Sequence, residues 1–108
     1  MPLTIKEVME SMPGAFLPDK AGDLDVTIQF HMGGEQSGDW YATIKDGGCK
    51  INEGTIDDPT MALTADGEDY IDVVTGKLDG MQAFMQGKLK LKGDMNLAMK
   101  MTSFFNLG

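Results

Sequence analysis

His31 and Cys49 are the side chains of this chain best suited to act as a general base or a nucleophile, and each residue type occurs once among 108 residues. Alternation of apolar and polar residues puts His31 on the polar side of a predicted strand. Cys49 begins a strand and not a helix, whose N-terminus would stabilise a thiolate. No Gly-x-Ser-x-Gly motif is present to expose a serine. Because no base and nucleophile are recognisably paired, the sequence does not predict an enzyme.

Metal and phosphate sites are not predicted either. The adjacent acids Asp57-Asp58 and Glu68-Asp69 lack the alternating spacing of a calcium loop, and a zinc site needs more His or Cys than this chain has. The glycines form neither a Gly-x-Gly-x-x-Gly motif nor a phosphate loop. The glycine–lysine pairs are more simply interpreted as helix ends, and we expect no cofactor.

The charge of the chain excludes one class of partner. The formal net charge is −8, and all nine basic residues are lysine. Without arginine the bidentate fork that grips phosphates and guanine edges is absent, and an acidic chain is repelled by a phosphate backbone. We therefore expect no nucleic-acid binding.

The charge is also unevenly distributed. Residues 1–76 carry 4 lysines and 15 acids, whereas residues 77–108 carry 5 lysines and 2 acids. Two interpretations stay open. The lysines form an ordinary solvated face, or they form a weakly basic patch that touches an anionic membrane surface or the acidic head of a ligand.

Length and cysteine content favour a single domain in a reducing compartment. One cysteine allows no internal disulfide, and no apolar run approaches the roughly 18 residues of a membrane span. Glu7 and Glu10 interrupt the stretch that a signal peptide would need, and the ending Asn106-Leu107-Gly108 is not a peroxisomal address. We expect a cytoplasmic protein in which residues 1–108 form one domain.

A helix, then a meander of strands, is expected in the first half. Thr4 and Glu7 form a capping box, and Pro13-Gly14 predicts the helix end. Residues 24–32 and 40–44 alternate and predict half-buried strands. The turn Asp46-Gly47-Gly48 suits a hairpin to a third strand, since glycine adopts positive φ cheaply. With Gly47 and Gly48 as the loop, Ile44 opposes Ile51 and Lys45 opposes Lys50.

Strands and helices are mixed in the second half, and the whole chain is predicted to be α+β. Residues 61–65 alternate as a fourth strand, Asp66 caps a helix that ends at Gly76, and Asp79 starts a shorter turn that ends at Gly87. Residues 88–92 predict a fifth strand. Because helices join it to the fourth, we expect a crossover onto a parallel neighbour. Asp94 caps a last helix.

Methionine is the unusual component, with 10 in the chain. This side chain is flexible and polarizable and re-packs around apolar partners of different shape. The last helix is apolar on more than one side, so it is buried on several sides, faces a bound apolar molecule or docks on a partner. Composition leaves these three open. The last third of the chain gathers Met81, Phe84, Met85, Met95, Met99, Met101, Phe104 and Phe105.

The chain resembles the sterol carrier protein 2 family. The motifs that carry the resemblance are Gly76-Lys77, Ala83-Phe84, Gln86-Gly87-Lys88-Leu89-Lys90, Gly93-Asp94-Met95 and Leu97-Ala98-Met99-Lys100, in that order. The resemblance implies a five-stranded, mostly antiparallel sheet covered on one face by helices, with an apolar tunnel between sheet and helices. It also implies binding and transfer of fatty acids, fatty acyl-CoA, phospholipids or sterols without a catalytic step.

From this resemblance we predict a lipid ligand and the residues that bind it. The chain lacks the peroxisomal ending of eukaryotic members and reads as a stand-alone domain, so we prefer a straight-chain acyl lipid to a sterol. The Gln86 amide orients the ligand head or bonds to backbone at the Gly87 turn. Elements around Met99–Phe105 are the predicted gate. The predicted ligand-binding residues are Phe30, Trp40, Ile51, Ile71, Val74, Met81, Phe84, Met85, Gln86, Met95, Met99, Phe104 and Phe105.

Two other functions remain to be weighed against lipid binding. One is an accessory module whose Met/Phe-rich surface docks on a partner enzyme or on a second copy as a homodimer. The other is an enzyme that acts on a lipid inside the tunnel, which requires His31 or a buried acid to point into it. The strand alternation argues against the second.

Overall fold

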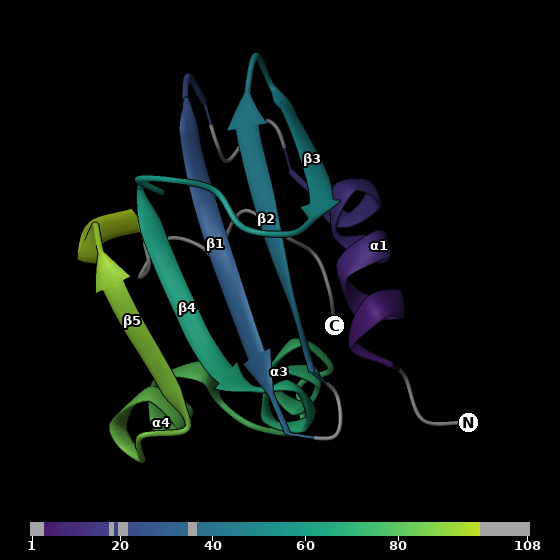
Figure 1. Ribbon diagram of the computed structural model, residues 1–108, viewed down its shortest axis with the longest axis vertical. Helices are drawn as coiled ribbons and strands as arrows, with labels where there is room; N and C mark the ends of the chain where they lie inside the picture. Colours follow the sequence, from purple (N-terminus) through teal and green to yellow (C-terminus); the bar gives the residue numbers. More distant parts are fainter. Residues whose placement is uncertain (1–3, 18, 20–21, 35–36, 98–108) are drawn as a thin grey trace.

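The protein is an α+β domain built on one five-stranded sheet (Figure 1). The computed structural model describes residues 4–17, 19, 22–34 and 37–97. The sheet order is β3-β2-β1-β4-β5. In chain order the elements are α1 (Ile5–Ala15), β1 (Val26–Gly33), β2 (Gly38–Lys45), β3 (Gly48–Glu53), β4 (Met61–Asp66), α3 (Gly67–Val74), α4 (Gly80–Met85) and β5 (Leu89–Gly93).

The sheet is mostly antiparallel, as predicted, but its parallel pair is not the predicted one. β5 pairs antiparallel with β4, and the parallel pair is β1 with β4. The end of β4 at Ala65 pairs with the start of β5 at Leu89. The helices α3 and α4 therefore return the chain to the end of the sheet that it left, whereas the crossover rule describes connections that carry the chain back across the sheet.

The hairpin between β2 and β3 has the predicted turn chemistry and a different register. Asp46 and Gly47 form the loop, with φ values of 54° and 73°, as a type I′ turn requires. Ile44 consequently pairs with Cys49, and Ala42 pairs with Ile51. The predicted pairs of Ile44 with Ile51 and of Lys45 with Lys50 were wrong. The shift is two residues, an even number, so Ile44 and Ile51 still share a face.

Helix α1 begins as predicted and ends later. The Thr4 hydroxyl oxygen accepts a hydrogen bond from the Glu7 backbone N–H at 3.1 Å, and the apolar stripe of the helix is buried. The predicted stop at Pro13-Gly14 was wrong, because α1 continues to Ala15. A proline in the last turn removes a single helical hydrogen bond. Phe16 follows as the cap residue and is buried.

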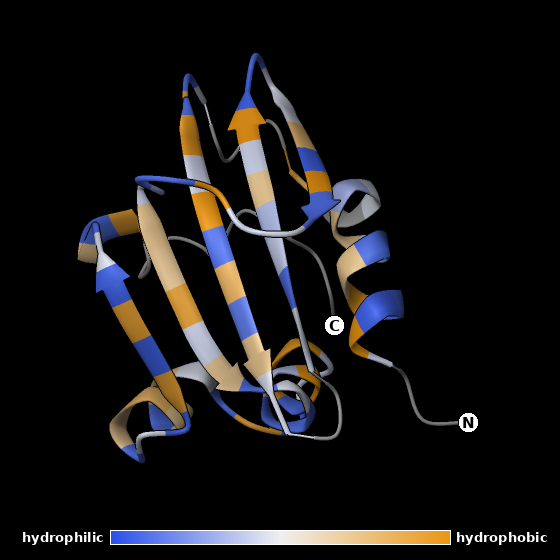
Figure 2. Ribbon diagram, viewed as in Figure 1, coloured by the Kyte–Doolittle hydropathy of each residue, from blue (hydrophilic) through white to orange (hydrophobic). Residues whose placement is uncertain are grey.

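The two faces of the sheet differ in polarity. Alternate residues of every strand form one apolar face, against which α1 and α3 pack (Figure 2). The opposite face is polar and includes His31, whose Nδ1 lies 2.9 Å from Asp39 Oδ1. The segment between β3 and β4 crosses this polar face in Figure 1. It is held there by the Gln29 amide, which is 2% exposed and bonds to Gly54 and Ile56.

Candidate functional site

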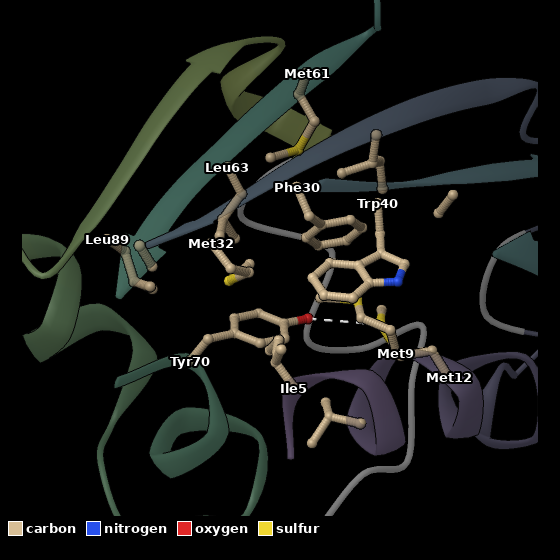
Figure 3. Packing of buried hydrophobic residues seen from close by; sticks show 14 of the residues in the cluster. Ile5, Met9, Met12, Phe30, Met32, Trp40, Met61, Leu63, Tyr70 and Leu89 are labelled. Carbon is tan, nitrogen blue, oxygen red and sulfur yellow. Dashed lines mark hydrogen bonds between the residues drawn. The ribbon is translucent and has the colours of Figure 1, made fainter. Parts of the chain in front are cut away.

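The apolar face of the sheet is centred on three aromatic and aliphatic side chains in one row. Phe30 on β1 pairs with Trp40 on β2 and with Leu63 on β4. All three are buried, and Figure 3 shows them pointing from the sheet toward the helices. The alternation of each strand puts these side chains on the same side, so their position follows from the pleat. We call the packed apolar side chains between the sheet and helices α1 and α3 the apolar interior.

Helix α3 contributes an aromatic residue to the apolar interior. The ring centroid of Tyr70 lies 5.8 Å from that of Phe30, with an interplanar angle of 58°. Such tilted aromatic pairs are favourable. The Tyr70 hydroxyl donates to Met12 Sδ at 3.7 Å (Figure 3). A thioether is a weak acceptor, so this hydroxyl is a polar group held in an apolar surrounding by a weak hydrogen bond.

Four methionines line the apolar interior from different elements. Met9 and Met12 come from α1, Met32 from β1 and Met61 from β4, and each is at most 5% exposed. Methionine has more rotatable bonds than leucine or isoleucine and fills irregular space. An interior lined in this way can re-pack around an inserted chain at lower cost than one lined by branched side chains.

The ionisable groups near the apolar interior are held neutral. Burial raises the pKa of the Tyr70 hydroxyl well above its ordinary value, and the Cys49 charge adds to the effect. Burial also raises the pKa of the half-buried Cys49 thiol from 9.0 to about 11. The thiolate is the reactive form, so at neutral pH Cys49 is a poor nucleophile. His31 lies on the opposite face of the sheet.

The predicted ligand-binding residues fall into four groups. Phe30 and Trp40 are buried in the apolar interior. Outside the described residues lie Met99, Phe104 and Phe105, together with Met101 and the predicted gate. Ile51, Ile71 and Val74 are partly buried and packed against the core. The exposed group consists of Met81, Phe84, Met85, Gln86 and Met95. The structure does not bring this last group together with Phe30 and Trp40, and its role in binding a ligand stays a prediction.

The residues that sequence reasoning left out of the site are the buried methionines and Tyr70. The periodicity of the sequence contained a signal for each of these methionines. Met9 and Met12 belong to the helical stripe of α1, and Met32 and Met61 stand at alternating strand positions. What the periodicity could not show is that these stripes face one another across the same interior.

Gln86 lines a groove that borders the apolar interior at Ala65, a buried residue that belongs to both. The groove is open to solvent, has a volume of about 430 Å³ and lies between the end of β4, the start of α3 and the segment that leads into β5. Within the described part of the chain, no hydrogen bond joins the Gln86 side chain to the Gly87 turn, and its own backbone N–H bonds to Gln82. The groove is also lined by Gly33, Gly34, Thr64, Ala65, Asp66, Asp69, Gly87, Lys88 and Lys90.

A metal-binding cluster and a membrane-spanning helix are both absent from the described ranges. Residues 4–17, 19, 22–34 and 37–97 contain no group of three His, Cys, Asp or Glu side chains placed to hold a metal ion. Across the same ranges, no helix combines the length and apolarity needed to cross a bilayer.

Fold and site together define a class of protein: a small α+β domain whose single sheet, covered on one face, borders a methionine-rich apolar interior. Residues 9–106 match the SCP-2 sterol transfer family. The chain belongs to this family.

Curated relatives and solved structures agree with this assignment. Hydroxysteroid dehydrogenase-like protein 2 of Xenopus tropicalis is 43% identical over 76 residues, which are 68% of this chain and 18% of that protein. The protein of the same name from Pongo abelii is 38% identical over 105 residues, 94% of this chain and 25% of that one. The chain thus spans a quarter or less of the length of these relatives.

Among solved structures, Sterol Carrier Protein 2 Like 2 from Aedes aegypti has a TM-score of 0.75 and 25% identity, covering 92% of this chain and 91% of that chain. The sec-alkylsulfatase Pisa1 from Pseudomonas sp. has a TM-score of 0.79 and 24% identity, covering 97% of this chain and 16% of that one. The fold therefore occurs both by itself and as part of a larger protein.

Proposed function

We propose that this chain is a non-catalytic lipid-binding and transfer domain that holds one acyl chain in the apolar interior. The observation that carries the proposal is the lining of that interior by four buried methionines around Phe30 and Trp40. Burying a methylene group is worth about 0.8 kcal/mol, so an acyl chain gains affinity along its whole length. Fatty acids, fatty acyl-CoA and phospholipids share this chemistry.

The resemblance to a solved lipid-loaded form supports a straight-chain ligand. The palmitated form of the Aedes aegypti protein has a TM-score of 0.76 to this chain. A flexible acyl chain also suits an interior of flexible methionines, whereas a rigid sterol needs a preformed shape. We therefore rank sterol below a fatty acid as the ligand.

Catalysis is not part of the proposal. The Cys49 thiol is protonated at neutral pH because burial raises its pKa, and His31 is bonded to Asp39 on the far side of the sheet. His31 therefore faces away from a chain bound in the apolar interior, and Cys49, which packs against that interior, is a poor nucleophile there.

Trp40 supplies a reporter for the test because it is the single tryptophan of the chain and is buried beside Phe30. Bromine quenches tryptophan fluorescence at short range. Titration with 9,10-dibromostearate should quench Trp40, unbrominated stearate should reverse the quenching by competition, and cholesterol should compete less well. If a fluorescent fatty acid binds and dibromostearate leaves Trp40 unquenched, the ligand binds elsewhere and the proposal fails.

A pair of variants on one strand sharpens the test. Ala65 is buried on the apolar face of β4, and Ala62 is partly exposed on the polar face of the same strand. Ala65→Phe fills space in the apolar interior and should lower fatty-acid affinity at least tenfold, whereas Ala62→Phe should leave it unchanged. Equal affinities in two folded variants would contradict the proposed site.

The second candidate function is an accessory module that delivers or holds a lipid for an enzyme. The observation that favours it is the coverage of the relatives, in which the matched stretch is 18% to 25% of a protein named for a dehydrogenase. A stable partner in sedimentation velocity, with no exchange of lipid between vesicles, would favour this function over transfer.

A further inference from the structure

Helix α4 carries an apolar stripe that faces solvent. Met81, Phe84 and Met85 are 54%, 39% and 79% exposed. They stand at positions i, i+3 and i+4, on one side of the helix. Ala83, on another side, is the buried residue of α4. An apolar stripe of this kind normally faces the core, and here it lies at an outer corner of the molecule beside the edge strand β5 (Figure 2).

Hydrogen bonds at both ends and packing on α3 hold α4 in the orientation that exposes this stripe. Asp79 Oδ1 accepts a hydrogen bond from the Met81 backbone N–H at 2.9 Å, and the Lys88 N–H bonds to the Ala83 carbonyl at 2.8 Å. Gly80 packs closely enough on α3 that a Cβ there would lie 3.5 Å from Val73 Cγ1. Caps at both ends and packing on α3 fix the side of the helix that faces outward.

Exposed lysines flank the stripe. Lys77 precedes α4 and Lys88 follows it, with Lys90 next on β5, and all three are exposed. Within the part of the chain that the structure describes, none of them makes an ion pair, since the ion pairs there are Lys6 with Glu10 and His31 with Asp39. Residues 77–108 are also the segment with an excess of lysine. The corner is thus apolar at its centre, and its border carries these three lysines together with the exposed carboxylate of Asp79, which caps α4.

We propose that α4 is the site at which this domain docks on an anionic lipid bilayer. Met81 and Met85 insert below the headgroups, while Lys77 and Lys88 contact anionic headgroups, as in other interfacial helices. The proposal deepens the proposed function, on which it rests, by naming the surface through which the domain meets the membrane that supplies its lipid. It also assigns Met81 and Met85 to contact with the bilayer in place of the predicted ligand wall.

A second copy of the chain fits this surface less well. With about 200 Å² per side chain, the observed exposures of Met81, Phe84 and Met85 amount to about 350 Å². A stable interface buries about 800 Å² on each partner. A bilayer needs no complementary surface, so a small convex apolar stripe suffices for reversible contact.

The charges around α4 affect how strongly the contact prefers anionic lipid. Asp66 and Asp69 line the groove beside Lys88, and they weaken the positive field of the lysines. We therefore expect the apolar stripe to supply most of the binding and the lysines to supply the preference for anionic lipid. Raising the salt concentration screens only the second contribution.

Vesicle flotation tests the proposal. The full chain is mixed with extruded vesicles of phosphatidylcholine alone, or of phosphatidylcholine and phosphatidylglycerol at about 7:3, and the partition coefficient is measured at low and high salt. The Met81→Gln/Met85→Gln double variant should lower partitioning on both vesicles at least tenfold, because it removes two apolar side chains from the stripe. The helix itself should be kept, because glutamine has about the same helix propensity as methionine. Lys77→Gln/Lys88→Gln should remove only the preference for anionic vesicles.

Matched variants provide the controls. Met95 is also an exposed methionine, at 43%, and lies beyond the other end of β5, so Met95→Gln should leave vesicle binding unchanged. Met81→Leu/Met85→Leu keeps the stripe apolar and should retain binding. Lys6→Gln, on α1, serves as the control for the lysine pair. Circular dichroism confirms that each variant is folded.

The outcomes separate this proposal from the proposed function. Loss of vesicle binding with unchanged dibromostearate quenching of Trp40 supports α4 as the docking site. Loss of both in a folded double variant would overturn it and make Met81 and Met85 ligand contacts. Absence of vesicle binding by the wild-type chain, or a dimer that the double variant abolishes, would also overturn it. Absence of quenching in the wild-type chain would refute the proposed function alone.

Discussion

Gln29 allows the sharpest prediction about stability, because one buried side chain holds the segment that crosses the polar face. The amide is 2% exposed. Nε2 donates to the Trp40 carbonyl at 2.9 Å and to the Gly54 carbonyl at 3.1 Å. Oε1 accepts from the Ile56 N–H at 2.9 Å. A longer contact of 3.4 Å reaches the Phe30 carbonyl and adds little.

Gln29→Leu removes these bonds while keeping similar volume. Three well-formed hydrogen bonds contribute about 1 kcal/mol each, and an Ile56 N–H left without its acceptor adds about 1 kcal/mol more. Burial of the leucine returns part of this. We therefore expect a loss of about 2 to 4 kcal/mol in the free energy of unfolding. For a domain of this size the melting temperature should fall by about 8 to 16 °C.

Urea and thermal unfolding followed by circular dichroism measure the loss, and amide hydrogen exchange shows where it arises. Exchange at Ile56 should accelerate in Gln29→Leu. The control is Gln86→Leu at an exposed glutamine, which should change the free energy by about 0.5 kcal/mol or less. A Gln29→Leu variant within about 1 kcal/mol of wild type, with Ile56 still protected, would refute the assignment of Gln29 as the anchor of this segment.

Four further predictions concern three residues. Cys49 should react slowly with a thiol reagent at pH 8 in the folded chain and rapidly in urea, because its pKa is raised to about 11. A raised pKa favours folding below the unfolded value of 9.0, so wild type should lose stability relative to Cys49→Ala between pH 9 and about 11. Gly93→Ala should cost about 2 kcal/mol or more in chemical denaturation, because φ is 94° and a Cβ would meet the Thr60 carbonyl oxygen. Tyr70→Phe should change the melting temperature by only a few degrees, because its hydroxyl bonds weakly to Met12 Sδ.

Much of the fold could be predicted because local patterns are fixed by backbone geometry. The alternation in residues 24–32 places Phe30 on the apolar side and His31 on the polar side, whatever the strand pairs with. Likewise, Thr4, Asp66, Asp79 and Asp94 accept backbone N–H bonds at helix starts, as the sequence predicted. Each of these interactions spans three residues or fewer.

The errors came from interactions that the sequence does not encode locally. The hairpin register depended on which two of three turn residues form the loop, and a sequence containing Asp46-Gly47-Gly48 permits either choice. The direction of β5 depended on whether α3 and α4 carry the chain across the sheet or return it to the same end. Both outcomes are compatible with the same helix and strand patterns.

The candidate site shows the same division between pattern and packing. The sequence by itself determined that the chain is α+β and rich in methionine, because composition and periodicity carry that information. Only the tertiary structure decided which methionines lie in the apolar interior and which face solvent. Met9 and Met61 are distant in sequence and both lie in the apolar interior, whereas Met81 and Met85 lie in an amphipathic helix whose apolar side faces solvent. A helical period shows that a stripe exists, but the packing of the whole chain determines which way that stripe faces.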